Sequence, residues 1–551
     1  MSTLARLRLA RDSQVTVANL VDELLRRCGD CEVGIDSSFD TGGPLTLAGL
    51  HAEVASIDAF LRHTVGLRPG QLVAVYRTND HLCFRWFLAI IRAGGIAVPL
   101  NPLLSLGEVR RILTESGADI LVTDTAIFSR KIGDRGLLPV QCWIQADNQE
   151  ETMDGFLRAG QSLERAGRSQ EIDPPTTIDP AATIAIFHTS GTSGFPKGAA
   201  LSSRALLGAR ATVALARLVL GPKDLALVAL PWSHIMAVSI ALYGLMAGIR
   251  GCFLEHFDLG PALDLIERFK VTAVVGVPAI FTRLINSHPD PERLRTVRVW
   301  LSASDHLPLA VREQMRAYGA LIRLPWRRRI PPVVLNGYGM VELGGLAMMG
   351  VELSFLPGSG DLCFPMPPFQ IRVADDAGRH LHAGMTGECQ IRRRGLEPHY
   401  WKSGGDDSDG LLTHDGWLRT GDLATRNRLG MIRLVGRMKD VIKSGGYSVY
   451  VREVEEAVLA HPAVARAAAF GLPHAEKGQI PAVAVELRSA GLVSEDELVT
   501  WCRERLAAYK APRRIWIVES GELTQNTTGK MMRRVMQEHF ATFSESVKPG
   551  A

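Results

Sequence analysis

The hydrophobic positions in the first part of the chain alternate between two spacings. Helical spacing of apolar residues predicts helices over 15–27, 51–64, 81–93 and 108–116. Short apolar runs typical of buried strands lie at 71–76, 96–100, 120–123 and 183–187. Strands that alternate with helices indicate a largely parallel α/β sheet.

After a polar, proline-bearing stretch at 145–180, which we expect on the surface, the alternation resumes. It predicts strands at 225–230, 271–277, 297–302 and 333–335 and helices at 262–269, 279–286 and 309–318. After about residue 360 short strands dominate, at 370–373, 387–392 and 431–435. The last hundred residues are mixed, with helices over 451–459 and 495–506 and strands near 465–470 and 482–487.

These patterns predict an α/β fold with a large N-terminal domain and a small C-terminal α+β domain. The N-terminal domain would contain α/β sheets and a β-rich subdomain. The basic, glycine-bearing stretch 436–440 is the candidate boundary. We therefore expect domains over 1–436 and 440–551, joined at 437–439.

One loop carries an unusual concentration of polar groups. Residues 189–198 (TSGTSGFPKG) combine three glycines, four hydroxyl side chains and Lys197 after the apolar run at 183–187. Backbone N–H and hydroxyl groups in such a loop can all face one anion. An Ala/Leu-rich segment from Ser203 predicts a helix, and a strand, loop and helix in this order can hold phosphate. The generic G-x-x-x-x-G-K-[ST] motif does not fit around Pro196 and Gly198, and the alternative is a polar surface loop.

Composition narrows the class of protein. The chain has 551 residues, of which 46% are hydrophobic and 22% charged, as in soluble multidomain proteins. A net charge of +4 is too small to indicate nucleic acid or an anionic membrane as the main partner. Among eight cysteines, Cys28 and Cys31 alone form a C-x-x-C, which favours unpaired thiols in a reducing cytosol over a metal or redox site.

Two segments could suggest export or membrane insertion. The N-terminal MSTLARLRLARDSQ is basic, but no apolar stretch of signal-peptide length follows it. Residues 225–249 contain no Asp, Glu, Lys or Arg, but Pro231 to His234 leave only 235–249 as an uninterrupted apolar run. That run is short for a membrane span. We therefore expect a buried core helix in a cytoplasmic protein with at most peripheral membrane contact.

Four further segments carry candidate chemistry. NGYGMVE at 336–342 offers close backbone approach, an aromatic face and a carboxylate, and LRTGD at 418–422 places a carboxylate on a loop. GRMKDVIKSGGY at 436–447 sets basic residues around a Gly-Gly turn, and LTQNTTGKMMRR at 523–534 presents Lys530 after a glycine. Each segment alone also has an ordinary explanation as a turn or a solvated lysine. Their order and spacing together are far more specific.

In this order the five motifs resemble those of the acyl-adenylate-forming enzymes, a superfamily that includes acyl-CoA synthetases, firefly luciferase and peptide-synthetase adenylation domains. The resemblance covers about residues 67–534 and points to the acyl-CoA synthetase, or fatty-acid–CoA ligase, branch. It implies that a carboxylic acid reacts with ATP to give acyl-AMP and pyrophosphate, and that the acyl group then passes to a thiol. The implied cofactors are ATP, Mg²⁺ and coenzyme A, and the implied C-terminal domain is a mobile lid.

The resemblance also implies roles for residues of the large domain. Glu342 would bind magnesium, which neutralises charge as pyrophosphate leaves. Tyr338, flanked by Asn336, Gly337 and Gly339, would stack on adenine. The opposite adenine wall would consist of Ser302, Ala303, Ser304 and Asp305. The loop that grips the β- and γ-phosphates would consist of Thr189, Ser190, Gly191, Thr192, Ser193, Gly194 and Lys197.

Further roles concern the ribose and the C-terminal domain. Asp422 and Arg437 resemble the contacts to the ribose hydroxyls. Lys530 resembles the lysine that bridges the substrate carboxylate and the α-phosphate and stabilises the charge developing there. Lys439 stands at the hinge about which the small domain rotates between half-reactions. After that rotation Lys443, Gly445 and Gly446 would face the active site for thioester formation.

The sequence departs from the family pattern at three places. Val341 replaces a common threonine, and Ala303 and Ser304 stand where the adenine wall has glycines. The segment 323–332 (RLPWRRRIPP) is longer and more basic than usual. Its prolines and arginines predict a surface loop without regular strand pairing, beside the nucleotide end of the site. It is either a solvated loop or a patch that attracts the phosphates of coenzyme A or an acidic carrier protein.

The substrate is constrained by the segment around His234. His234 matches the residue that acyl- and aryl-CoA ligases place beside the carboxylate, although it could also be a core histidine. Residues 233–236 lack the aspartate with which peptide synthetases hold an α-amino group. The apolar run 236–244 fits a hydrocarbon-lined pocket, so we expect a fatty or other apolar acid. No carrier domain follows Lys530, which favours free coenzyme A as acceptor.

Other functions remain open at this stage. The protein could be an acyl-AMP ligase that loads a carrier protein. It could be a luciferase-type oxygenase. It could also be a weak or non-catalytic nucleotide-binding homologue, which Val341 and the altered adenine wall would explain. Acid-dependent release of pyrophosphate separates an enzyme from a non-catalytic homologue, and the dependence on coenzyme A tests the acceptor. Light emission with an added luciferin and oxygen would reveal the oxygenase.

Overall fold

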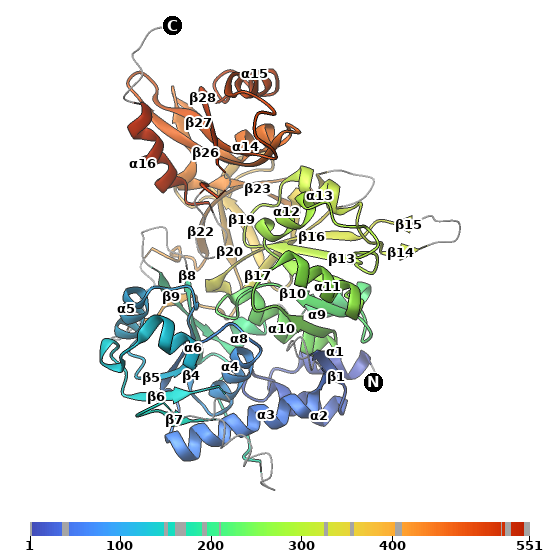
Figure 1. Cartoon of the computed structure of the whole chain (residues 1–551), viewed down its shortest axis with the longest axis vertical. Helices are drawn as coiled ribbons and strands as arrows, with labels where there is room; N and C mark the ends of the chain where they lie inside the picture. The colour runs from blue at the N-terminus through green and yellow to red at the C-terminus, as the bar shows by residue number, and fades with distance from the viewer. Residues whose placement is uncertain are drawn as a thin grey trace.

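The computed structural model has a large N-terminal domain and a small C-terminal domain, which lies at one end of the long axis (Figure 1). The boundary between the two sheet systems falls near residue 440, where β23 (Ile432–Arg437) of the large domain is followed by β24 (Ile442–Ser444) of the small one. The structure describes residues 3–35, 43–147, 153–159, 172–189, 196–208, 211–323, 329–352, 358–402, 410–519, 521–523 and 531–544.

One of the two main sheets of the large domain has eight strands, in the order β21-β9-β8-β4-β3-β5-β6-β7. Strands β8, β4, β3, β5, β6 and β7 are parallel, and β9 and β21 extend the sheet in antiparallel pairing. The bounds are β3 (Leu72–Val75), β4 (Ile96–Pro99), β5 (Ile120–Thr123), β6 (Cys142–Gln145), β7 (Leu157–Arg158), β8 (Thr183–Thr189), β9 (Lys197–Ser202) and β21 (His399–Tyr400).

The other main sheet has thirteen strands, in the order β19-β20-β22-β23-β18-β17-β16-β13-β12-β10-β11-β1-β2. Strands β16, β13, β12, β10, β11 and β1 are parallel to one another. Strands β17, β18, β23, β22, β20 and β19 continue the sheet beyond β16, each antiparallel to its neighbour. The predicted β-rich subdomain is therefore the antiparallel half of a continuous sheet. The bounds are β1 (Glu32–Ile35), β2 (Pro44–Thr46), β10 (Leu225–Val228), β11 (Arg250–Phe253), β12 (Ala273–Gly276), β13 (Val299–Ala303), β16 (Val333–Met340), β17 (Gly345–Glu352), β18 (Leu362–Pro365), β19 (Gln370–Ala374), β20 (Thr386–Arg392) and β22 (Leu418–Arg426).

Helices cover these sheets, and their ends follow local capping chemistry. Helix α5 is capped by Ser105, whose hydroxyl accepts the Glu108 N–H while the Glu108 carboxylate accepts the Ser105 N–H. The helices of the large domain are α1 (Thr3–Arg11), α2 (Leu20–Cys28), α3 (Leu47–Phe60), α4 (Leu82–Arg92), α5 (Leu106–Ser116), α6 (Thr125–Ile127), α8 (Ser203–Leu206), α9 (Ala211–Val219), α10 (Ile235–Ala247), α11 (Leu259–Phe269), α12 (Pro278–Asn286) and α13 (Leu309–Met315). Short π or 3-10 turns are η1 (Leu61–Val65), η2 (Phe128–Ile132), η3 (Arg135–Leu137), η4 (Val341–Leu343), η5 (Ser359–Asp361) and η6 (Met438–Asp440).

The hydrophobic pattern located most elements within a few residues. The strand at 120–123 and the helix over 451–459 have the predicted bounds. The helix predicted over 15–27 begins instead at Leu20, because the Asn19 side chain accepts the Thr16 N–H and forms a local turn. Inside the stretch expected to be an excursion, Leu157–Arg158 form the edge strand β7.

Helix α10 is the buried core helix that the apolar run at 235–249 predicted. Eleven of its residues are buried, and they lie on all sides of the helix. Among the residues that the structure describes, no helix combines the length and the apolar character needed to cross a bilayer.

The C-terminal domain is a five-stranded sheet between helices. Val483 and Val485 contact the cluster under α14 and α15, whereas Ala482 and Ala484 face the cluster that includes Met536 of α16. Both faces of β27 are therefore buried, which explains its continuous apolar run. The remaining bounds are β25 (Tyr447–Val449), β26 (Val464–His474), β27 (Gly478–Leu487), β28 (Arg514–Val518), α14 (Val451–Leu459), α15 (Glu495–Arg505) and α16 (Arg533–Ser544).

A buried ionic network joins the two domains. Arg312 of α13 is fully buried and donates to Glu352 at 2.7 Å and to Asp361 at 3.0 Å. Arg452 of α14 donates to the same Asp361 oxygen at 2.7 Å. Nearby, His306 Nε2 lies 2.7 Å from a carboxylate oxygen of Glu456. These contacts hold α14 against the large domain.

The expectation for the basic segment 323–332 was wrong in two respects. Ile322–Arg323 (β14) and Arg329–Ile330 (β15) pair in two antiparallel rungs, because Pro331 and Pro332 follow the paired residues. This exposed hairpin projects from the body of the domain (Figure 1). It also precedes the first residue of β16, whereas the predicted nucleotide residues Asn336, Gly337, Tyr338 and Gly339 lie within β16, from its middle toward its other end. Two of the three consecutive arginines of this segment, Arg327 and Arg328, lie outside the described residues.

Candidate active site

Two of the sequence motifs meet at the carboxyl ends of parallel strands. Ser302 and Ala303 of β13 are the register partners of Asn336 and Gly337 of β16. Ligands of open parallel sheets bind outside this edge. The SASD and NGYG segments, far apart in the sequence, therefore form one wall.

The glycines of this wall are required by close packing. A Cβ atom on Gly337 would lie 2.4 Å from Leu346 Cδ1, and one on Gly339 would lie 2.0 Å from the Gly345 carbonyl oxygen. Gly339 therefore cannot accept a side chain without moving the backbone of β17, whereas a side chain at Gly337 would require the Leu346 side chain to shift. Asn336 next to them donates from Nδ2 to the Gly360 carbonyl at 3.2 Å and fixes the strand on its other side.

Tyr338, Asp422 and Arg437 form a connected polar group. The Tyr338 hydroxyl donates to Asp422 Oδ2 at 2.6 Å, and Arg437 Nε lies 3.5 Å from Asp422 Oδ1. Asp422 and Arg437 face each other in the β22–β23 pair, so the sheet register brings them together. Burial and the charge of Asp422 raise the pKa of Tyr338 well above its usual value. The tyrosine therefore stays neutral beside Asp422.

Ser304 and His234 meet at the same wall. His234 caps α10, and its Nδ1 accepts the Met236 N–H at 3.2 Å. In a neutral ring the proton then lies on Nε2, which is 3.4 Å from the Ser304 hydroxyl. Asp305 beside them is exposed and accepts the His306 N–H at 2.8 Å.

Replacing Ser304 with glycine is expected to stabilise the protein by roughly 0.5–1 kcal/mol. Ser304 has a φ of +81°, a left-handed conformation that costs an L-residue about 1–2 kcal/mol. The greater freedom of glycine in the unfolded chain offsets about 0.4–1 kcal/mol of that gain. Thermal unfolding of S304G and of S304A, which keeps the Cβ atom, checks this. A melting temperature that rises equally in both variants would contradict the strain argument.

The phosphate-loop motif joins two strands, and the helix predicted from Ser203 begins there as α8, but only after the second of these strands, β9, which was not predicted. Thr189 ends β8 and Lys197 opens β9, and the two residues are antiparallel partners. The run after Lys197 is buried between β8 and β21, and short apolar runs fit a buried strand as well as a helix. An anion here would therefore be held by loop N–H groups and side chains rather than by a helix end. Ser190, Gly191, Thr192, Ser193 and Gly194 lie outside the described residues.

A second polar group lies beside the ends of this loop, and it contains a residue that the sequence did not reveal. Glu342 is buried, and its Oε1 accepts the Tyr400 hydroxyl at 2.7 Å. The Lys197 ammonium lies 4.9 Å from the centre of the Tyr400 ring. Tyr400 sits in a strand of two residues and belongs to no spacing pattern, so a sequence signal for it was lacking.

The remaining predicted residues belong to the small domain. Gly445 and Gly446, with φ of +56° and +83°, form the two-residue turn between β24 and β25. Lys443 on this hairpin donates to Ser448 at 2.8 Å, and Gly445 N–H donates to the Lys477 carbonyl. Lys439 lies in the turn η6 between the two sheet systems. The structure thus places the hairpin in the C-terminal sheet and not in the wall described above. Lys530 lies outside the described residues.

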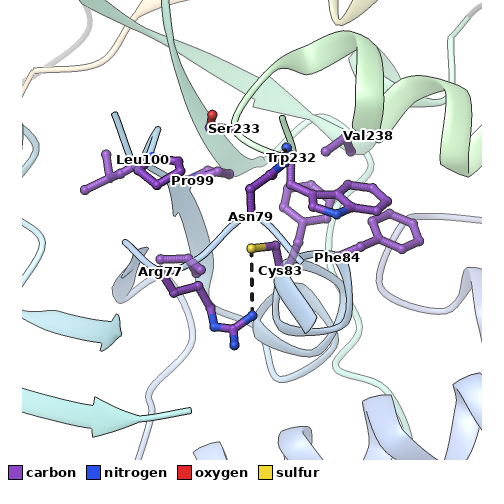
Figure 2. Close-up of a pocket in the computed structure, with 12 residues that line it drawn as sticks. Arg77, Asn79, Cys83, Phe84, Pro99, Leu100, Trp232, Ser233 and Val238 are labelled. Atoms are coloured by element: carbon purple, nitrogen blue, oxygen red, sulfur yellow. Dashed lines mark hydrogen bonds between the residues drawn. The ribbon is translucent and has the colours of Figure 1, made fainter. Parts of the chain in front are cut away.

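A small, mostly apolar cavity, whose lining also includes Arg77 and Asn79, adjoins the His234 segment (Figure 2). It lies between the ends of β3 and β4 and the helices α4 and α10, and the Phe84 and Trp232 rings stack beside it at 4.8 Å. Val238 is the residue of the predicted apolar run 236–244 that lines it. Burial raises the pKa of Cys83 to about 12, so its sulfur is a thiol and not a nucleophile.

Two family models match the chain. One, described as AMP-binding enzyme, matches residues 25–401, and the other, described as AMP-binding enzyme C-terminal domain, matches residues 453–530. The long-chain-fatty-acid–CoA ligase of Yersinia pestis is 29% identical and covers 93% of this chain and 92% of its own length. A feruloyl-CoA synthase from Amycolatopsis is 28% identical and covers 91% and 94%.

A solved structure shares the whole fold. The ATP-bound RpMatB-BxBclM chimera B3 superposes with a TM-score of 0.79 at 26% identity, over 96% of this chain and 99% of that one. The arrangement of a large sheet domain and a small C-terminal domain, predicted from the sequence, is thereby confirmed.

Proposed function

The chain belongs to the AMP-binding enzyme family, and on that premise we propose that it is an AMP-forming acid–thiol ligase specific for an apolar carboxylic acid. It would convert ATP and the acid to acyl-AMP and pyrophosphate, and then transfer the acyl group to coenzyme A. The observation that carries this proposal is the adjacency of the two polar groups around Tyr338 and Glu342. They are four residues apart on β16 and η4, beside the ends of the phosphate-loop motif.

The residues present suit a bound nucleotide. The Tyr338 ring would pack on adenine against the Ser302–Asp305 wall, and its hydroxyl would remain on Asp422. Asp422 is partly exposed, and a carboxylate can accept from both ribose hydroxyls while Arg437 balances its charge. Lys197 and the loop from Thr189 would bind the β- and γ-phosphates.

Glu342 has the chemistry of a magnesium ligand. Mg²⁺ prefers oxygen ligands and is commonly held by one or two carboxylates together with substrate phosphates. The buried carboxylate of Glu342 uses Oε1 for Tyr400, which leaves Oε2 for a cation. Among the described residues, no group of three or more His, Cys, Asp or Glu side chains forms a closed metal site. When bound, the ion would withdraw charge from the leaving pyrophosphate.

The acid would lie with its carboxylate at His234. His234 stands between the Ser304 wall and the apolar lining that includes Trp232 and Val238. A neutral Nε2–H can donate to a carboxylate oxygen, and an apolar lining favours a hydrocarbon chain or ring over a charged side chain. One of the two relatives reported above is named for a fatty acid and the other for an aromatic acid, and both classes of acid fit this proposal.

The C-terminal domain would act as the lid. We place the domain boundary at 437–439, with Lys439 of η6 as the hinge and residues 440–551 as the moving part. Rotation there would break contacts such as Arg452 to Asp361 and would change which loop of the small domain faces the nucleotide. Lys530 would serve acyl-AMP formation and the Lys443–Gly446 hairpin would serve thioester formation.

Pyrophosphate release with a panel of acids, run with and without coenzyme A, tests the proposed function. Medium and long fatty acids and cinnamate-type acids are expected to release pyrophosphate, and coenzyme A is expected to convert the acyl-AMP to a thioester. Pyrophosphate release without any coenzyme A thioester would instead indicate a carrier protein as acceptor. Absence of acid-dependent release with every acid would overturn the proposal.

A bulky residue at Gly446 is expected to separate the two half-reactions. G446W should slow thioester formation at least 10-fold, because the hairpin would obstruct the thiol, and should leave acyl-AMP formation nearly unchanged. The left-handed φ of Gly446 adds strain to any side chain, so a matched control is needed. Gly491, in the same domain, has a similar φ of +75° and an equally open Cβ position, and G491W is expected to spare both steps. Equal loss of both steps in G446W would show that the hairpin only supports the fold.

A further inference from the structure

The segment that carries Tyr400 crosses from one main sheet to the other. It lies between β20 and β22 of the thirteen-stranded sheet, yet it pairs with β9 at the edge of the eight-stranded one. Trp401 fixes it there, because its N–H donates to the Gly198 carbonyl at 2.7 Å and its indole N–H donates to the Ser116 carbonyl at 3.0 Å. Tyr400 is therefore held at the junction of the two sheets.

Tyr400 makes two contacts of different kinds with charged groups. Its hydroxyl donates to Glu342 at 2.7 Å, and the Lys197 ammonium lies 4.9 Å from its ring centre. A cation within about 6 Å of a ring centre is attracted to the face of the ring. The Glu342 carboxylate thus binds at the hydroxyl of Tyr400 and the Lys197 ammonium lies at the face of its ring, so one side chain contacts both charged groups.

We propose that Tyr400 is a positioning residue that sets Glu342 and Lys197 for the metal and the phosphates. This inference rests on the proposed function of that site. The hydroxyl fixes the orientation of the Glu342 carboxylate and occupies one of its oxygens, so that the other oxygen faces the cation. The ring keeps the ammonium of Lys197 on its own face, where the ammonium can meet a phosphate instead of neutralising Glu342.

Residues that orient a metal ligand have a measurable effect on metal affinity and on activity. Loss of such a partner commonly costs about 10–100-fold in metal affinity or activity. Glu342 is 6% exposed, so water cannot readily replace the missing donor. If Tyr400 were only structural, loss of its hydroxyl would lower the stability of the protein and leave the Mg²⁺ dependence of the reaction unchanged.

Two substitutions separate the two contacts. Y400F removes the hydroxyl and keeps the ring, and it is expected to raise the Mg²⁺ concentration for half-maximal pyrophosphate release about 10-fold. At saturating Mg²⁺ its KM for ATP should change less than twofold. Y400L also removes the ring beneath Lys197, and it is expected to raise the KM for ATP several-fold even at saturating Mg²⁺. The control is Y76F, which removes a phenol hydroxyl bonded at 2.9 Å to the Leu104 carbonyl, and it should alter neither quantity.

A binding measurement makes the test independent of turnover. Mn²⁺ is titrated calorimetrically into wild type, Y400F and Y76F, each saturated with a non-hydrolysable ATP analogue. We expect about 10-fold weaker Mn²⁺ binding in Y400F alone. Equal Mn²⁺ affinity in Y400F and wild type would overturn the inference, whatever the melting temperature. If the wild type released no pyrophosphate with any acid, the proposed function would be refuted. The Mn²⁺ titration would still test whether Tyr400 positions the metal ligand.

Discussion

Replacing Lys530 with alanine is expected to slow acyl-AMP formation about 10²–10³-fold, the scale of removing one preorganised group that stabilises developing charge. In the proposed reaction the substrate carboxylate attacks the α-phosphate, and two anions must approach each other. An ammonium between them lowers the barrier more than it strengthens ground-state binding, because charge concentrates there in the transition state. The loss should therefore appear in kcat and kcat/KM rather than in the KM for ATP alone.

Acid-dependent exchange of pyrophosphate into ATP measures this step without coenzyme A. The matched control is K510A, which removes another lysine of the same domain, one that pairs with Glu453 at 2.6 Å at the surface. We expect K510A to exchange pyrophosphate at the wild-type rate. A K530A enzyme with an unchanged exchange rate would refute the role given to Lys530.

The largest expected effect on stability comes from Arg312. R312M should destabilise the protein by about 3–5 kcal/mol, because it leaves Glu352 buried without its cation. Both side chains of this pair are fully buried, and Arg312 also holds Asp361, to which Arg452 of the small domain binds. The change should therefore weaken the large domain and its contact with α14 together.

Guanidinium unfolding, followed at two or more probes, gives the change in free energy. E352Q in the R312M background is expected to recover part of the loss, because a neutral amide leaves no uncompensated buried charge. R111M is the control, since Arg111 pairs with Glu115 in an exposed i,i+4 arrangement worth at most about 1 kcal/mol. R312M that costs no more than R111M would show that the buried network contributes little.

Particular residues show how far the sequence pattern could be taken. The pair Asp422 and Arg437 was assigned to one role from separate motifs, and the β22–β23 register places them opposite each other. The helix predicted from Ser203 begins at that residue as α8, but the strand before it, β9 (Lys197–Ser202), was not predicted, because a short apolar run has no period that separates a buried strand from a helix. The basic segment 323–332 was placed at the nucleotide end, and it lies at the other end of β16, because the direction of a strand in a sheet is a property of the topology.

By itself the sequence determined the alternation of helices and strands in the large domain, the buried helix α10 and the motifs that carry the candidate site residues. These features depend on local spacing and on short segments whose residues act together, so one chain suffices to find them. Only the tertiary structure decided that Tyr400 joins Glu342 and Lys197, and that His234 meets Ser304. It also decided that Arg312 and Arg452 share Asp361 across the two domains. The physical reason is that these contacts join residues from distant segments, and their distances are set by sheet pairing and domain packing, which no local pattern encodes.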